Sequence, residues 1–89
     1  MLTKKEVIRI NEKVGKEFNT EYGLLNNGNL DYALICDDPY LVALNILRCH
    51  PFLDGNKRTS FMVYMLLTTT RDYDSILKDY YDILLSLSK

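Results

Sequence analysis

The longest strictly apolar stretch of the sequence, residues 61–67, limits most tightly how this chain can fold. It is far shorter than the roughly 20 residues that a membrane-spanning helix needs, so it belongs in a protein core. A buried helix and a fully buried strand are the two candidates for such a run. Neither flank carries strand signals, and the other segments have helical periodicity. We therefore predict a central buried helix that begins near Asn56.

Length and composition limit the class of protein further. The 89 residues leave room for one core, so we expect a single domain over residues 1–89. Hydrophobic residues make up 47% and charged residues 26%, which excludes a disordered chain and a membrane protein. The N-terminal residues lead straight into an amphipathic pattern instead of the apolar stretch of a signal peptide. We expect a cytoplasmic protein without a membrane partner.

Charge and cysteine content exclude two further classes. Eleven basic and twelve acidic residues give a net charge of −1, without the basic excess of proteins that bind nucleic acid through its phosphates. We therefore do not expect nucleic acid as a partner. Cys36 and Cys49 are too few for a disulfide scaffold, so we expect reduced, buried thiols. A metal site of Cys36, Cys49 and His50 is the alternative, although structural zinc usually has more ligands at tighter spacing.

The first helix has a clear start signal. Thr3 and Glu6 form a capping box, in which each side chain binds the other residue's backbone amide. The helix is predicted to run to about Phe18. Its inward stripe at helical spacing is expected to be Val7, Ile10, Val14 and Phe18.

A loop and two further helices are expected next. Residues 22–29 contain two glycines and an Asn-Gly pair, which predict a loop or a short hairpin. Asn29 can cap a short helix, whose inner face would carry Leu30, Ala33 and Leu34. Asp38 is a plausible N-cap for the following helix, with Pro39 at its first position. Residues 40–49 are apolar almost all round, which predicts a helix buried on most sides.

The second half completes the predicted fold. A compact loop is predicted for residues 50–55, because a His-Pro pair ends the preceding helix and an Asp-Gly-Asn sequence favours a turn. Asp74 or Ser75 can start a last amphipathic helix. Its inner face would carry Ile76, Leu77, Tyr80, Leu84 and Leu87. The prediction is an all-α bundle of about five helices, with the loop at the N-terminus of the central helix.

Residues 50–59 concentrate a titratable base, a carboxylate, a glycine and two cations in one loop and helix start. At a helix N-terminus the backbone amides of Asn56, Lys57 and Arg58 lack helical acceptors, so they can bind an anion with the help of the helix dipole. Gly55 has no Cβ, so the backbone can approach a phosphate closely. These features together predict a phosphate-binding loop.

The side chains of this loop suit the chemistry of phosphate esters. Arg58 can direct two donors at phosphate oxygens, whereas Lys57 offers a compact point charge. Asp54 is a suitable oxygen ligand for a magnesium ion that bridges phosphates. Histidine is the side-chain type that titrates near neutral pH, so His50 can take a proton from an incoming hydroxyl.

Each of these residues also has a purely structural interpretation. A histidine at a helix end can complement the helix dipole, Asp-Gly-Asn is a common turn, and neighbouring cations are usually solvated surface charges. Phe52 and Leu53 are expected to anchor the loop in the core under either interpretation. The convergence of a base, a carboxylate, a glycine and cations on one loop favours the functional interpretation.

Residues 50–58, HPFLDGNKR, closely resemble the H-P-F-x-[D/E]-G-N-[G/K]-R motif of the Fic/Doc family, and specifically its death-on-curing (Doc) branch. Residues 28–34 resemble the short glycine-led helix that precedes the motif helix in Doc-like proteins. The resemblance implies a helical fold that binds ATP with Mg²⁺ and modifies a hydroxyl of a target protein. It implies that His50 is the general base, Asp54 the metal ligand and Phe52 the loop anchor. The implied phosphate-binding residues are Gly55, Asn56, Lys57 and Arg58.

Two positions depart from the pattern of AMP-transferring Fic proteins. Lys57 stands where those enzymes have a second glycine, and Phe61 stands where they carry a second arginine. The lysine fills space in which a second phosphoryl group would lie against bare backbone, and the missing arginine removes a group that would hold the far phosphates. The Doc-like branch shares the lysine, and there the resemblance implies transfer of the terminal phosphoryl group. We therefore favour a protein kinase activity over AMP transfer.

The resemblance also implies protein partners. Doc-like proteins resemble toxins of toxin–antitoxin pairs that act on the translation machinery, so we expect a target of the translation-factor class and an antitoxin partner. Residues 21–29 are a candidate flap that docks the target as an added strand. Two other functions stay open, which are AMP transfer to a protein hydroxyl and a catalytically idle Fic-fold binding module.

Overall fold

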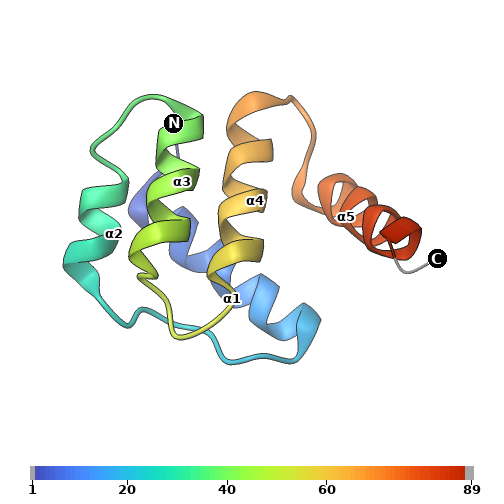
Figure 1. The fold of residues 1–89 in the computed structure, drawn as a ribbon, viewed down its shortest axis with the longest axis horizontal. Coiled ribbons are helices and arrows are strands. Elements are labelled where there is room, and N and C mark those ends of the chain that lie inside the picture. Colours follow the sequence, from blue (N-terminus) through green and yellow to red (C-terminus); the bar gives the residue numbers. More distant parts are fainter. Residues whose placement is uncertain (1, 88–89) are drawn as a thin grey trace.

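Five helices make up the described chain (Figure 1). The computed structural model describes the backbone of residues 2–87 and the side chains of residues 2–82. The helices are α1 (Lys4–Phe18), α2 (Asn27–Ala33), α3 (Pro39–Cys49), α4 (Asn56–Thr68) and α5 (Tyr73–Leu87). Within this range no strand forms, and one isolated antiparallel bridge joins Leu24 to Phe52. The prediction of an all-α fold with five helices is confirmed, and no described helix is both long and apolar enough to cross a membrane.

α1 and α3 begin at the predicted caps. The Glu6 backbone N–H donates to the Thr3 hydroxyl at 3.2 Å, and the Thr3 N–H donates to the Glu6 carboxylate at 3.0 Å. At α3 the Asp38 carboxylate accepts a hydrogen bond from the Tyr40 N–H at 2.8 Å, and Pro39 occupies the first turn. Both helix starts were predictable because the capping signals lie within three residues of the helix they begin.

α2 and α5 begin earlier than predicted. The side chain of Asn26 caps α2 and accepts a hydrogen bond from the Asn29 N–H at 2.9 Å, so the Asn-Gly pair lies in the first helical turn and forms no hairpin. α5 starts at Tyr73, where the Asp72 carboxylate accepts a hydrogen bond from the Ser75 N–H at 2.8 Å. Both predictions failed because each segment holds several residues that can cap a helix equally well.

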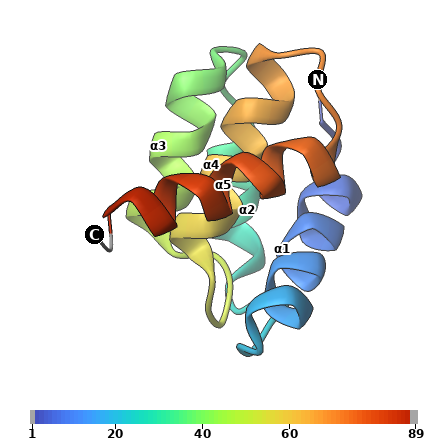
Figure 2. The same ribbon diagram turned by 90° about the vertical axis from the view of Figure 1, so that its right-hand side faces the viewer.

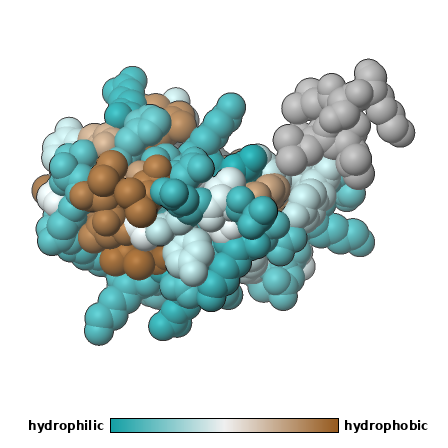
Figure 3. Space-filling model, turned by 90° about the horizontal axis from the view of Figure 1, so that it is seen from below, coloured by the Kyte–Doolittle hydropathy of each residue, from teal (hydrophilic) through white to brown (hydrophobic). Residues whose placement is uncertain are grey.

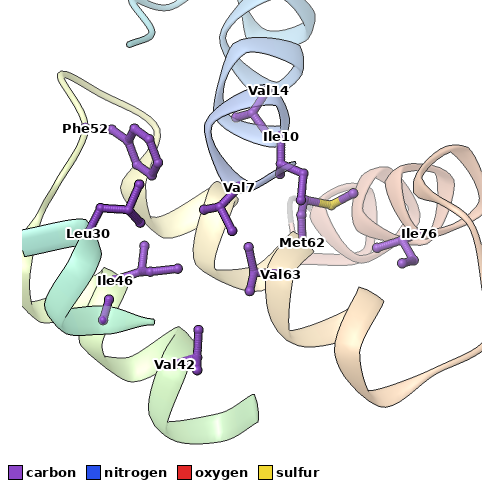
Figure 4. Packing of buried hydrophobic residues seen from close by; sticks show 11 residues of the cluster. Val7, Ile10, Val14, Leu30, Val42, Ile46, Phe52, Met62, Val63 and Ile76 are labelled. Carbon is purple, nitrogen blue, oxygen red and sulfur yellow. The ribbon is translucent and has the colours of Figure 1, made fainter. Parts of the chain in front are cut away.

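α4 is the central helix and packs against α1, α3 and α5. α5 runs across α4, as Figure 2 shows. The core between the helices draws side chains from all five of them and from the loop that precedes α4 (Figure 4). Its buried members are Val7, Ile10, Val14, Leu30, Ala33, Val42, Ile46, Phe52, Met62, Val63 and Ile76. The apolar run at residues 61–67 is therefore part of a central helix, as predicted.

The outer helices match their predicted inward faces in part. Val7, Ile10 and Val14 of α1 are buried, whereas Phe18 is half-buried at the end of the helix. In α5 Ile76 is fully buried and Leu77 is partly buried. The predicted inward positions Leu84 and Leu87 lie outside the residues whose side chains are described.

α3 is more exposed than its sequence predicted. Only Val42 and Ile46 of this helix are buried, while Tyr40 is 60% exposed and Leu47 is 39% exposed. The described neighbours of α3 are α2 and α4, which cover only part of its circumference. The thiol of Cys49 at its end is partly exposed, as is that of Cys36, so the prediction of buried thiols is wrong; both cysteines are free.

Candidate functional site

The loop at residues 50–55 is bounded by two left-handed residues. His50 ends α3 with a φ of 48°, and its N–H donates to the Ile46 carbonyl at 3.2 Å. Gly55 precedes α4 with a φ of 71°, and a Cβ added there would lie 3.3 Å from Cγ1 of Val14. Sequence analysis explained this glycine by the approach of a phosphate. The structure adds a packing reason, because α1 lies directly against it.

Asn56 holds the loop from within. Its side-chain oxygen accepts a hydrogen bond from the Phe52 N–H at 3.0 Å, and its Nδ2 donates to the Phe52 carbonyl at 3.1 Å. Phe52 itself is 1% exposed and lies in the core. Leu53 was expected to share that anchoring role, but it is 50% exposed. The turn points the ring of Phe52 inward, and the next residue along the chain therefore faces outward.

Asn11 of α1 is a loop-holding residue that sequence analysis missed. It is fully buried, and its Nδ2 donates both to the Asp54 carbonyl at 2.9 Å and to the Thr59 hydroxyl at 3.1 Å. Its side-chain oxygen accepts a hydrogen bond from the Gly23 N–H at 2.8 Å. One amide therefore connects α1, the loop, α4 and the segment before α2. The available signal was a polar residue on the inward face of an amphipathic helix.

The segment at residues 23–26 lies alongside the loop, and both run along the bottom of Figure 1. The N–H groups of Leu25 and Asn26 donate to the Pro51 carbonyl at 2.8 and 3.0 Å. The Leu53 N–H donates to the Gly23 carbonyl at 3.0 Å. Residues 23–26 of the predicted flap at residues 21–29 are thus fixed to the loop, and the last three residues of the flap belong to α2. Figure 3 shows this face of the molecule, which is largely hydrophilic around a prominent apolar patch.

Asn29 connects α2 to the end of α3. Its Nδ2 donates to the Cys49 carbonyl at 2.8 Å, directly before His50. The last carbonyls of a helix have no helical donors, so this bond satisfies one of them and fixes the position at which the loop begins. Sequence analysis gave Asn29 a different task, the capping of α2.

The loop and the first turn of α4 line a pocket of about 420 Å³. Its lining residues are His50, Leu53, Asp54, Gly55, Asn56, Lys57, Arg58 and Tyr80. Of the predicted site residues, all except Phe52 line it, and Phe52 lies in the core. The side chains of His50, Asp54 and Lys57 are exposed. Tyr80, which was predicted on the inner face of the last helix, is half-buried and also lines the pocket from α5, a role that its sequence context did not predict.

The pocket has a positive electrostatic character. α4 begins at Asn56, so its first backbone amides lack helical acceptors, and Lys57 and Arg58 lie in the same turn. Neither cation enters an ion pair among the described residues. The Nε of Arg58 is buried and has no hydrogen-bond partner within the described part of the chain, and its guanidinium carbon lies 4.3 Å from the centre of the Phe18 ring. Such donors suit an anionic ligand such as a phosphate.

Asp54 supplies the carboxylate among the residues that line the pocket, and it is the candidate ligand for a metal ion there. Among the described residues no group of three or more His, Cys, Asp and Glu side chains is placed to hold a metal ion, so Cys36, Cys49 and His50 form no such site. The Asp54 carboxylate accepts a hydrogen bond from the Gly55 N–H at 2.7 Å and is otherwise exposed. A magnesium ion that keeps most of its waters and shares its ligands with phosphates needs little more from the protein.

Comparison with known proteins agrees with the motif and the geometry of the loop. The model of the Fic/DOC family matches residues 14–68, more than half of the chain. The matched segment includes α2, α3, the loop and α4. Comparisons with curated proteins and with solved structures give no match. On the strength of the family match, the chain belongs to the Fic/DOC family.

Proposed function

We propose that this protein is a Doc-like phosphotransferase, which transfers the terminal phosphoryl group of ATP to a hydroxyl of a target protein. Proteins of the Fic/DOC family generally transfer nucleotide-derived groups to proteins, with ATP as substrate and usually with Mg²⁺. The observation that carries the proposal is the pocket at the N-terminus of α4, which brings His50, Asp54, Lys57 and Arg58 together. A base, a helix start and two cations that form no ion pair with the described residues suit phosphoryl transfer, which depends on positioning and on neutralisation of phosphate charge.

In the proposed reaction, each side chain has one task. The α4 amides, Lys57 and Arg58 bind the phosphate oxygens and offset the negative charge that repels the incoming hydroxyl. The His50 imidazole takes the proton of the target hydroxyl as its oxygen bonds to the terminal phosphorus, and the bond to the leaving ADP breaks. Asp54 would hold a magnesium ion, which when bound neutralises phosphate charge.

Phosphoryl transfer is favoured over AMP transfer by the surroundings of Lys57 and Phe61. Lys57 lines both the pocket and a groove between α3 and α4, so its side chain would lie at the boundary of the proposed phosphate site. Phe61 lines the same groove and packs against Tyr80, with ring centres 5.3 Å apart. The position that holds a second arginine in AMP-transferring relatives therefore supplies an apolar ring and no donor for the far phosphates.

The same groove supports a protein partner, which we propose to be a helical segment of an antitoxin. Its volume is about 450 Å³, and its lining residues are Tyr40, Ala43, Leu44, Leu47, Lys57, Ser60, Phe61 and Tyr64. On each helix these residues follow the spacing of one helical face, which is the surface that a third helix covers. An acidic side chain on that partner would face Lys57. We further propose a cytoplasmic location and a target of the translation-factor class.

Label transfer tests the proposed reaction. The protein would be incubated with a translation extract and ATP labelled at either the α or the γ phosphate. We expect the γ label on protein, and a loss of about a hundredfold or more in His50→Ala, because the general base is removed. The same assay is applied to Arg58→Ala. Its matched control is Arg48→Ala, since Arg48 is an exposed cation of α3 that does not line the pocket.

The outcomes separate the three functions. Transfer of the α label would contradict the kinase and support AMP transfer. If neither label reaches protein, and His50→Ala keeps the effect of the wild-type chain on cell growth, the protein is a binding module and not an enzyme.

A further inference from the structure

Among the described residues, Arg58 is held by an aromatic surface and not by a carboxylate. Its guanidinium carbon lies 4.3 Å from the centre of the Phe18 ring, and its buried Nε has no hydrogen-bond partner in the part of the chain that the structure describes. A guanidinium that stacks on a ring keeps the N–H donors at its edge free, whereas a salt bridge would use them. The contact with Phe18 therefore fixes the direction of Arg58 and, among the described residues, leaves the N–H groups of its two terminal nitrogens for a ligand, whereas Nε itself is buried.

Phe18 is itself fixed by two tyrosines of α5. The Tyr80 ring meets it edge to face, with ring centres 5.6 Å apart and an angle of 86° between the planes. The Tyr81 ring lies 5.5 Å away on centres. Edge-to-face and tilted ring pairs at these distances are favourable. The end of α1 and the described part of α5 thus form one aromatic cluster, Phe18, Tyr80 and Tyr81, beside the first turn of α4.

Tyr81 has a second contact, with the carboxylate beside Phe18. Its hydroxyl donates to Glu17 Oε1 at 2.6 Å, and this hydrogen bond raises the pKa of Tyr81. Arg58 and Tyr81 both contact the Phe18 ring, so the guanidinium lies near this tyrosine, and its charge acts on the pKa of Tyr81 in the opposite direction. Glu17 forms no ion pair with Arg58 among the described residues. The acidic group one residue from Phe18 is therefore engaged by Tyr81.

We propose that Phe18 and Tyr81 are positioning residues for Arg58, Phe18 by stacking on the guanidinium and Tyr81 by keeping the Glu17 carboxylate away from it. The ligand that would bind more tightly to the oriented arginine is the phosphate chain of a nucleoside triphosphate, so the inference rests on the proposed function. An arginine that is already oriented loses less side-chain freedom when it binds. An arginine paired with Glu17 would have to break that pair first.

Calorimetric titration of the full chain with Mg-ATP tests the role of Phe18. We expect Phe18→Leu to weaken binding by about threefold to tenfold, since leucine keeps the apolar contact but offers no ring to orient the arginine. Phe18→Trp keeps an aromatic ring at this position, so its affinity for Mg-ATP should be close to that of the wild type. The Arg58 side-chain NMR signals provide a readout that loss of stability alone would not move. They should be shifted upfield by the ring current in the wild-type chain and return toward the Arg48 signals in Phe18→Leu.

The role of Tyr81 is tested by a pair of variants. Tyr81→Phe keeps the ring and releases Glu17, so we expect ATP to bind about twofold to fivefold more weakly, the range of an exposed ion pair. Adding Glu17→Gln to Tyr81→Phe removes the competing charge and should restore wild-type affinity. A loss that persists in the double variant would contradict the proposed role of Tyr81.

The remaining outcomes separate this inference from the proposed function. If Arg58→Ala loses ATP binding while Phe18→Leu binds as the wild type does, Phe18 is not a positioning residue and the nucleotide function stands. If the wild-type chain binds no ATP, the proposed function fails, and the positioning role fails with it. An Arg58 signal without an upfield shift in the wild-type chain would overturn the stacking directly.

Discussion

The two chain segments at opposite ends of α4 are held in different ways (Figure 1). The loop at residues 50–55 is fixed by a buried amide far away in the chain, since Asn11 bonds to Asp54 and Thr59 across 43 and 48 positions. The link at residues 69–72 depends on local bonds. Arg71 forms a hydrogen bond to Asp79, and Asp72 forms one to Ser75. Both hydrogen bonds are exposed to solvent.

The difference shows how an open site can have a defined geometry. The side chains of His50, Asp54 and Lys57, which we propose to be functional, are exposed, and a surface location alone would leave them without fixed positions. Their backbone is nevertheless fixed by buried hydrogen bonds, which are costly to leave unmade because the groups cannot turn to water. The link to α5 has no such constraint, so the difference predicts where substitutions do the most damage.

Loss of the Asn11 side chain should have the largest effect. Asn11→Ala leaves the Gly23 N–H, the Asp54 carbonyl and the Thr59 hydroxyl without their partner inside the protein. At about 1–3 kcal/mol for each unsatisfied buried group, and with some relaxation, we expect a loss of about 3 kcal/mol in the free energy of unfolding. Urea unfolding at neutral pH measures it.

Asn45→Ala is the control for this substitution. Asn45 is a half-buried asparagine of α3 whose side chain makes one long contact, 3.7 Å from Nδ2 to the Cys36 sulfur. We expect a much smaller change there. Equal losses in the two variants would mean that the loop does not depend on its remote hydrogen bonds, and the contrast between the two ends of α4 would be wrong.

The substitution Gly55→Ala should have the next largest effect. A left-handed conformation costs a residue with a Cβ about 1–2 kcal/mol, and the added methyl must also displace Cγ1 of Val14 from 3.3 Å. Gly28→Ala is the matched control, because Gly28 lies within α2 and an added Cβ would lie 3.5 Å from the Asn26 side-chain oxygen, an ordinary van der Waals contact. Thermal unfolding should show Gly55→Ala less stable and Gly28→Ala at least as stable as the wild type.

Local signals explain which parts of this fold were predictable. Thr3, Asp38 and the His-Pro pair act within a few residues of their helix ends, so the bounds of α1 and α3 follow from the sequence. The predicted site residues are almost contiguous, so one loop brings them to one pocket. Where capping residues are repeated, as at Asn26 and Asn29, local signals do not distinguish between them.

The residues that sequence analysis missed act over long separations. Asn11 binds main-chain groups of the loop, and main-chain acceptors carry no mark in the sequence that would identify their partner. Phe18 was predicted to pack inward, and its contact with Arg58 depends on the angle at which α1 passes α4. Tyr80 reaches the pocket because α5 crosses α4, which a periodic pattern does not reveal.

The smallest effect is expected at the link to α5, where Asp79→Asn removes the partner of Arg71. The hydrogen bond from Arg71 lowers the pKa of Asp79 below its ordinary value of 3.8, and the bond from Ser75 lowers that of Asp72 in the same way. A lowered folded-state pKa stabilises the fold above the ordinary value, and that stabilisation is lost as the pH falls through the folded-state pKa. Asp79→Asn should therefore lower the midpoint of thermal unfolding slightly at pH 7. As the pH falls into the acid range, the midpoint of the variant should also decrease less steeply than that of the wild type.

Because the pair is exposed, salt screens it, and the difference from the wild type should shrink at high ionic strength. Asp82→Asn, on the same helix, is the control. A loss at Asp79 as large as that at Asn11 would show that local surface bonds hold this chain as firmly as buried ones.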